Sequence, residues 1–271
     1  MKRMTWRVVI LATLVMLVWG GGVIAQSAGP TMQVMAGFDG YCRNGSWCPL
    51  YIVLANEGMD IEGELTITVD EGASKEPNVY ASTVVLPSHS RKAYHLYAPP
   101  VSSSSRSRLM VRFRSGGDVL AQEMITLTWL DESGWLYGIV STDPSVLNFL
   151  TGIAPGSGGG AVAHLSLEAL PSDPLGWSGL RVLILNDVDT TVLGSDQREA
   201  LETWIAHGGH LVVGGGTGAA RTAAGLTELL PVVVGGVRSV EELGGVGDWV
   251  KAATTAGPYA VVETSLVEGD V

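Results

Sequence analysis

The 271-residue chain has little cysteine, little histidine and few charged side chains, and each shortage excludes a class of function. Its two cysteines, Cys42 and Cys48, do not form a zinc site without further ligands. Acidic residues outnumber basic ones by 27 to 16, which gives a net charge of −11 and makes the chain a poor nucleic-acid binder. Charged residues make up only 16%, and the 36 glycines are typical of a globular protein with many tight turns.

The N-terminus has the pattern of an export signal. Three basic residues, Lys2, Arg3 and Arg7, precede an apolar run over residues 8–19, and the small-residue site Val23-Ile24-Ala25 follows. We expect residues 1–25 to be a signal peptide cleaved after Ala25, which places the protein in the periplasm or outside the cell. The alternative is an uncleaved signal anchor, because the apolar run nearly reaches spanning length.

Export decides how the two cysteines are interpreted. Two close cysteines in an exported chain favour a disulfide, so we expect Cys42 and Cys48 to be bonded. Free thiols would be expected only in a reducing cytosol.

Residues 30–130 show the period-two alternation of short half-buried strands, which predicts an immunoglobulin-like β-sandwich. The segment 47–58 resembles the second strand of immunoglobulin-like modules in exported bacterial proteins. A linker is expected at residues 131–134. The predicted inward-facing positions are Leu50, Ile52, Leu54, Leu65, Ile67, Val69, Leu109, Val111 and Phe113.

The second half, residues 135–271, is organised around a strand, crossover helix and strand between Leu180 and Gly218. The apolar run 182–185 and the segment 211–213 are the two strands, and residues 195–207 have the pattern of a helix. Gly208 supplies the left-handed stop of that helix. Such a connection must be parallel and right-handed, so this half is expected to be an α/β domain.

Other segments complete this expected domain. Residues 136–140 and 161–166 have the pattern of strands, and Asp143 is placed to cap a short helix. Residues 239–242 carry a capping-box signature for a further helix. Residues 259–267 read as a last strand only four residues before Val271, so we suspect that the domain is truncated there.

The strand ending at Asn186-Asp187, the helix ending near Trp204 and the run 214–218 together resemble the core of class I glutamine amidotransferase-like domains. That resemblance implies a three-layer, flavodoxin-like fold with a mostly parallel sheet. Active members carry a nucleophilic cysteine in a Gly-x-Cys-x-Gly elbow and a later activating histidine. Here Gly216 occupies the nucleophile position and no histidine follows His210, so no catalytic residue is expected.

Ligands of open α/β sheets bind at the carboxyl ends of the strands, which defines a candidate ligand-binding edge. Asp187 and Asp189 could hold a divalent cation, but acids at strand ends are also common turn formers, and we favour that interpretation. Neither a metal nor a cofactor is therefore expected. The glycine amides could cradle an anion or simply permit a tight turn, and Thr217 lacks a nearby base. The edge consists of Asp143, Asn186, Asp187, Asp189, Gly214, Gly215, Gly216 and Thr217.

The pairing of these two halves looks like that of uncharacterised bacterial envelope proteins, which often continue to a membrane helix. We therefore expect a non-catalytic binding or scaffolding protein of the cell envelope. Its partner would be an envelope protein or a small ligand, and a signal anchor or a missing C-terminal segment would provide membrane association. The alternatives are a hydrolase acting through Asp143, Asp187 and Asp189, and an adhesin acting through the sandwich.

Overall fold

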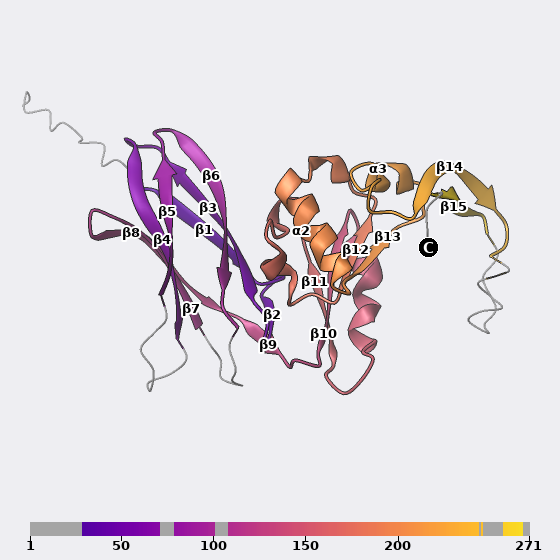
Figure 1. Ribbon diagram of the computed structural model, residues 1–271, viewed down its shortest axis with the longest axis horizontal. Coiled ribbons are helices and arrows are strands. Elements are labelled where there is room, and N and C mark those ends of the chain that lie inside the picture. The colour runs from indigo at the N-terminus through magenta and orange to yellow at the C-terminus, as the bar shows by residue number, and fades with distance from the viewer. Residues whose placement is uncertain (1–28, 71–78, 101–107, 244, 246–256, 268–271) are drawn as a thin grey trace, which may run out of the picture.

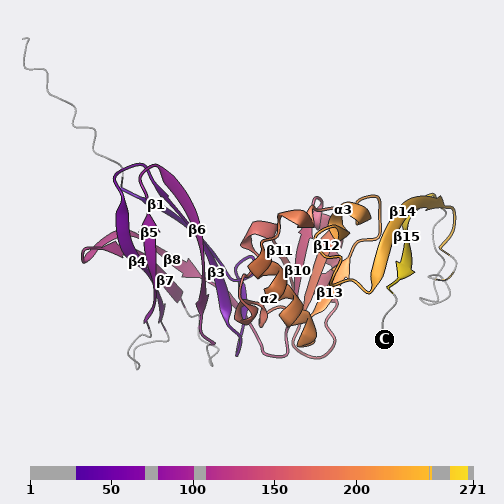
Figure 2. The same ribbon diagram turned by 45° about the horizontal axis from the view of Figure 1, so that its top comes forward.

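The computed structural model describes residues 29–70, 79–100, 108–243, 245 and 257–267 (Figure 1). The predicted signal peptide, residues 1–25, lies outside the described residues. The described chain forms a sandwich of two antiparallel sheets, a unit built on a parallel sheet, and a two-stranded ribbon at the end farthest from the sandwich (Figures 1 and 2).

The sandwich has the strand order of an immunoglobulin-like fold, as predicted. One sheet has the order β1-β3-β6 and the other β5-β4-β7-β8, and every pair within them is antiparallel. The strands are β1 (Thr31–Ala36), β3 (Cys48–Asn56), β4 (Ile61–Asp70), β5 (Val79–Leu86), β6 (Ser90–Ala98), β7 (Arg108–Ser115) and β8 (Asp118–Thr126).

Alternation along these strands produces the core of the sandwich. All nine predicted inward-facing side chains are buried, and Leu65 of β4 lies directly opposite Phe113 of β7. Neighbouring side chains on the other face remain exposed or half-buried, except the buried Pro49 and Thr66. The hydrophobic cluster is continuous across both sheets. The period-two pattern of the sequence therefore correctly predicted which side chains face the core of the sandwich.

Two short strands connect the sandwich to the second unit. Strand β2 (Tyr41–Arg43) pairs in parallel with β9 (Thr128–Leu130), and the predicted linker at residues 131–134 falls between β9 and the next strand. The linker is a turn in which the amide of Gly134 donates to the carbonyl of Asp131 at 2.8 Å. The start and the end of the sandwich are thereby tied together at its junction with the second unit.

The second unit is built on four parallel strands in the order β11-β10-β12-β13. The predicted strand–helix–strand connection is present: α2 crosses from β12 to β13, and Gly208 after the helix has φ of +93°. Leu201 and Trp204 form the buried face of this helix. The elements are β10 (Trp135–Ser141), β11 (Gly160–His164), β12 (Val182–Asn186), α2 (Ser195–Ala206) and β13 (His210–Val213).

The predicted three-layer, flavodoxin-like domain with a mostly parallel sheet is wrong. Among the described residues strands outnumber helices, most strands belong to antiparallel sheets, and α2 is the one α-helix longer than two turns. Pro171, Pro174 and Gly176 prevent an α-helix between β11 and β12, because proline lacks the amide donor and glycine loses the most backbone entropy. The other helical segments are η1 (Pro144–Gly152), η2 (Leu167–Ala169), η3 (Pro174–Trp177), η4 (Thr190–Val192) and the five-residue α3 (Ala219–Ala223).

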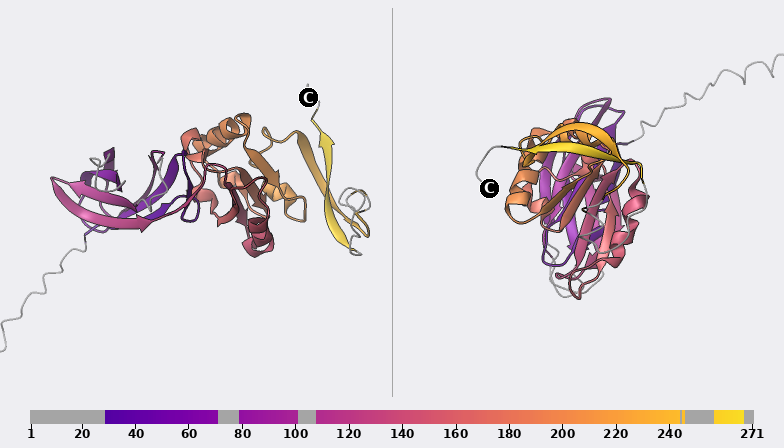
Figure 3. Two further views of the ribbon diagram at one scale, coloured as in Figure 1. Left: turned by 90° about the horizontal axis from the view of Figure 1, so that it is seen from below. Right: turned by 90° about the vertical axis from the view of Figure 1, so that its right-hand side faces the viewer.

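After α3 the chain forms an antiparallel ribbon instead of another strand–helix unit (Figure 3). Strand β14 (Val232–Val240) pairs with β15 (Tyr259–Leu266), so the last predicted strand is confirmed. The helix start predicted at residues 239–242 is wrong, because Ser239 and Val240 continue β14. The segment where the body of that helix would lie, residues 244 and 246–256, is outside the described residues. No helix among the described residues is long and apolar enough to cross a bilayer.

Candidate functional site

The predicted residues at the ends of β10 and β12 do lie together. The side-chain amide of Asn186 donates to the hydroxyl of Ser141 at 3.2 Å, and the hydroxyl of Thr142 donates to the carboxylate of Asp187 at 3.1 Å. Residues 45 positions apart in the chain thus form one hydrogen-bonded strip along the carboxyl edge of the sheet.

Asp187 is the centre of that strip. Its backbone has φ of +56°, a left-handed conformation that aspartate tolerates better than most residues. The guanidinium of Arg221 in α3 forms an ion pair with the Asp187 carboxylate and donates to its backbone carbonyl at 2.9 Å. Asp187 therefore links β12, the loop after β10, and α3.

The two other acids of the edge cap short helical turns. Asp189 accepts from the amide of Thr191 at 3.0 Å and from its hydroxyl at 2.6 Å, and these hydrogen bonds lower the pKa of the Asp189 carboxyl. Asp143 accepts from the amide of Ser145 at 3.2 Å and from its hydroxyl at 2.6 Å. Within the described ranges, no three histidine, cysteine, aspartate or glutamate side chains are placed to hold a metal ion. The contacts of Asp143 and Asp189 are those of turn-forming residues.

The glycine run packs tightly against the same edge. A Cβ added at Gly214 would collide with the Asn186 side chain, and one at Gly218 would collide with the Asp187 carboxylate. The carbonyl of Gly215 accepts from the amide of Val262 in β15 at 2.9 Å, so the ribbon docks on this loop. Glycine at these positions permits the close approach of neighbouring groups and does not leave the backbone amides as a free binding loop for an anion.

Gly216 and Thr217 are the least constrained positions of the edge. Nothing lies within 4 Å of a Cβ built at Gly216. The exposed Thr217 side chain makes no hydrogen bond with the residues that the structure describes. His210 begins β13, at the opposite end of the strand from this loop, so it does not provide Thr217 with a base.

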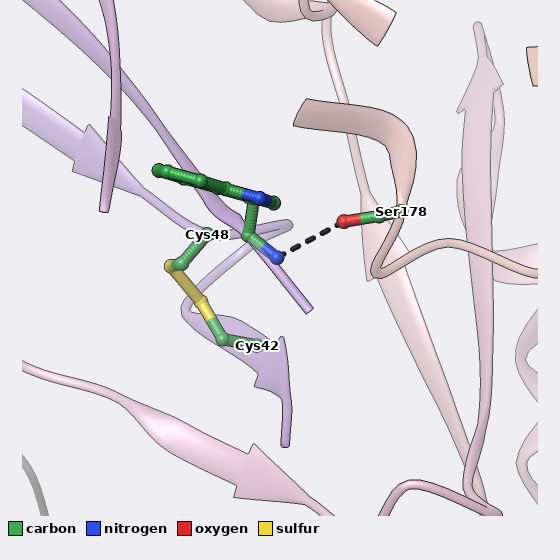
Figure 4. Close-up of a disulfide and its surroundings, with 4 residues drawn as sticks. Cys42, Cys48 and Ser178 are labelled. Atoms are coloured by element: carbon green, nitrogen blue, oxygen red, sulfur yellow. Dashed lines mark hydrogen bonds between the residues drawn. A yellow bond between two sulfur atoms is a disulfide. The ribbon is translucent and has the colours of Figure 1, made fainter. Parts of the chain in front are cut away.

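The predicted disulfide between Cys42 and Cys48 is present, with the two Cα atoms 5.6 Å apart (Figure 4). It joins β2 to β3, and both sulfur-bearing residues are buried. Directly before Cys48, the amide of Trp47 donates to the hydroxyl of Ser178 at 3.0 Å (Figure 4). The bridge thus stiffens the part of the sandwich that contacts the second unit.

A second contact between the units was not predicted from the sequence. The imidazole Nδ1 of His95 lies 2.9 Å from the hydroxyl of Ser172, whose backbone amide donates to the Tyr97 hydroxyl at 3.2 Å. Burial lowers the pKa of His95 and raises that of Tyr97. His95 is therefore a junction residue rather than an isolated core or surface side chain.

The turn at Asp39-Gly40 provides a third contact, and it did have a sequence signal. Both residues have positive φ, and Phe38 and Tyr41 exchange two backbone hydrogen bonds, which defines a two-residue hairpin turn. Asp-Gly between apolar residues is a strong signal for such a turn. The Asp39 carboxylate accepts from the amide of His164 at 3.2 Å and so caps the free edge of β11.

The family model that matches this chain covers the sandwich. Residues 29–128 match a family described as a domain of unknown function, DUF8726. This match covers less than half of the chain, so it describes that segment alone. No curated protein matches the chain.

Similar solved structures include the CARDB domain of a Pyrococcus furiosus protein in complex with di-metal ions. It has 11% identity and a TM-score of 0.30, and the match covers 38% of this chain and 90% of that one. The sporulation control protein Spo0M of Bacillus subtilis has 4% identity and a TM-score of 0.28, over 37% of this chain and 49% of that one. A calcium-binding mutant of Bacteroides uniformis β-glucuronidase 2 has 14% identity and a TM-score of 0.27, over 69% of this chain and 23% of that one. At these TM-scores the similarities establish no shared function.

Proposed function

We propose that this protein is an exported, non-catalytic binding or scaffolding protein of the bacterial cell envelope. One observation carries the proposal: at the carboxyl edge of the parallel sheet, where an α/β enzyme would bind its substrate, the polar groups are engaged in contacts within the chain. Asp187 is held by Thr142 and Arg221, and Gly215 is held by β15. We infer that these groups serve the fold rather than acting as a general base or as metal ligands.

Export is supported from two directions. The basic and apolar N-terminal pattern is that of a signal peptide, and the Cys42–Cys48 disulfide is typical of an oxidising compartment. Membrane association would come from retention of the apolar N-terminal segment as an anchor or from a C-terminal continuation of the chain.

The resemblance to glutamine amidotransferase-like domains is compatible with a binding role but rests on the sequence alone. Gly216 has no side chain at the position where the active enzymes have a nucleophilic thiol. Attack by that thiol is required for catalysis but not for binding. Neither the matching family nor any of the three similar structures is described as an amidotransferase. The binding partner would be an envelope protein or a small ligand.

The proposal is tested by expressing the full chain with a C-terminal tag in a bacterial host, fractionating the cells and cross-linking the intact envelope. We expect the exported protein to begin at Gln26 and to cross-link to a discrete envelope component. A variant with Lys2, Arg3 and Arg7 changed to glutamine is the control, because loss of the basic region should retain the chain in the cytosol. Unmodified Met1 on soluble cytosolic wild-type protein would contradict export, and export without any cross-linked component would contradict scaffolding. Met1 retained in the membrane fraction would establish the signal anchor.

A further inference from the structure

A cleft of about 420 Å³ lies between the sandwich and the second unit, away from the carboxyl edge. It is bounded by β2, by η3, by the start of β12 and by the end of α2. Its volume lies within the range of small-molecule sites, which is about 300–1,000 Å³. Its walls combine apolar side chains with three groups that can carry positive charge, Arg43, Arg181 and His207.

Arg43 is an unusual residue to find in the lining of this cleft, because the residue is only 9% exposed. Its Nη2 donates to the carbonyl of Ser178 at 2.6 Å, and its Nε donates to the hydroxyl of Ser46 at 3.2 Å. Its Nη1 is buried and has no hydrogen-bond partner among the described residues. A buried charged donor without a partner is costly, so this atom marks a place where an acceptor is missing.

Arg181 brings a second guanidinium to the same cleft. It is exposed, and its side chain makes no hydrogen bond or ion pair with any residue that the structure describes. Burial and the nearby charge of Arg181 lower the pKa of Arg43, whereas the carboxylate of Glu132 acts in the opposite direction. Glu132 does not form an ion pair with Arg43 in the described chain, so the repulsion between the two arginines is only partly offset.

We propose that this cleft binds a small organic oxyanion, with its carboxylate or phosphate group between Arg43 and Arg181 and its apolar body against Pro174, Leu175 and Trp204. A guanidinium presents several N–H donors in a plane that matches an oxyanion, and such charge-assisted bonds are roughly twice as strong as neutral ones. The bound anion would give the exposed guanidinium of Arg181 an acceptor and would offset the repulsion between the two arginines. Leu175, which is 48% exposed, would be covered by the body of the ligand.

Two features of the cleft oppose an anion and set its selectivity. The C-terminal end of α2 carries partial negative charge, and Glu132 lies close enough to act on Arg43. His207 uses Nδ1 to donate to the carbonyl of Thr203 at 2.7 Å, which leaves Nε2 to donate to the anion only when the ring is protonated. The site is therefore expected to prefer a ligand with one oxyanion group over a ligand with several. This proposal goes beyond the scaffolding role, because it holds whether or not an envelope partner exists.

Isothermal titration calorimetry of the exported protein at low salt tests the site with four probes: benzoate, phenyl phosphate, inorganic phosphate and benzylammonium. We expect saturable binding of benzoate and phenyl phosphate, much weaker binding of inorganic phosphate, and none of benzylammonium. Arg181→Gln should weaken benzoate and phenyl phosphate about tenfold, since one charge-assisted bond is lost. Arg114→Gln is the matched control, because Arg114 is an exposed arginine on the sandwich hairpin whose side chain donates to Gly117.

Arg43 is not the residue to mutate first, because its hydrogen bonds also hold the junction. Leu175→Trp provides the independent variant: it should fill the cleft and abolish binding while leaving the melting temperature of the protein within a few degrees. Absence of saturable binding by either aromatic anion would overturn the proposal. Equal loss in Arg114→Gln and Arg181→Gln, or binding of benzylammonium as tight as that of benzoate, would overturn it as well.

Discussion

Trp177→Ala is expected to lower the free energy of unfolding by about 3–5 kcal/mol, the range found when a large buried aromatic side chain is removed. Trp177 is fully buried, and its ring centroid lies 5.3 Å from that of Trp204 on α2. Its indole N–H donates to the carbonyl of Pro171 at 3.0 Å, and this acceptor would lose its partner. The residue also precedes Ser178, which contacts the sandwich, so the cavity would open at the junction between the units.

Urea unfolding followed by circular dichroism measures this loss, with two variants beside it. Trp177→Phe keeps most of the apolar volume and removes the N–H donor, so it should cost less than Trp177→Ala. Leu175→Ala changes a half-exposed neighbour in the same turn and should cost under about 1 kcal/mol. A Trp177→Ala protein within about 1 kcal/mol of wild type would show that Trp177 and η3 do not form part of the core.

Gly218→Ala is expected to cost about 1–3 kcal/mol, because the new methyl group would overlap the Asp187 carboxylate and displace it. That displacement would weaken the ion pair with Arg221 and the hydrogen bond from Thr142 together. Gly214→Ala should behave in the same way through the Asn186 side chain. Both effects arise from side chains that the sequence places far from the glycine run.

Gly216→Ala is the matched control for this pair, because nothing lies within 4 Å of its added Cβ. It should change stability by less than about 0.5 kcal/mol, as surface substitutions usually do. Thermal melting of the three variants side by side gives the comparison. Equal melting temperatures for Gly218→Ala and Gly216→Ala would mean that the edge is looser than its contacts indicate.

The sandwich was predictable because its signal is local. Leu65, Ile67 and Val69 alternate with polar residues, and a strand with that pattern can bury only one face. The strand–helix–strand connection at residues 180–218 was equally predictable, because its apolar run indicates the strand and its capping residues indicate the ends of the helix. The prediction of a three-layer domain failed for a local reason as well. The prolines at 171 and 174 shorten the helices that a third layer requires.

The candidate edge was predictable in position but not in role. Parallel strands bring their carboxyl ends together, so Asn186 and Asp187 were expected at one edge. Their partners, Ser141 and Arg221, lie 45 and 34 residues away, and no local pattern indicates which side chain will meet which. The contact of His95 with Ser172 spans 77 residues and depends on how the two units pack.

The central proposal is that the carboxyl edge of the parallel sheet holds the fold and performs no chemistry. The most direct test measures ammonia release from glutamine by the purified exported protein, with Gly216→Cys assayed beside wild type. We predict release at the level of the buffer blank for both, because a thiol at position 216 would still lack an activating base. Release by wild type above the blank, lost in Asp187→Asn or Thr217→Ala, would contradict the claim and establish an enzyme.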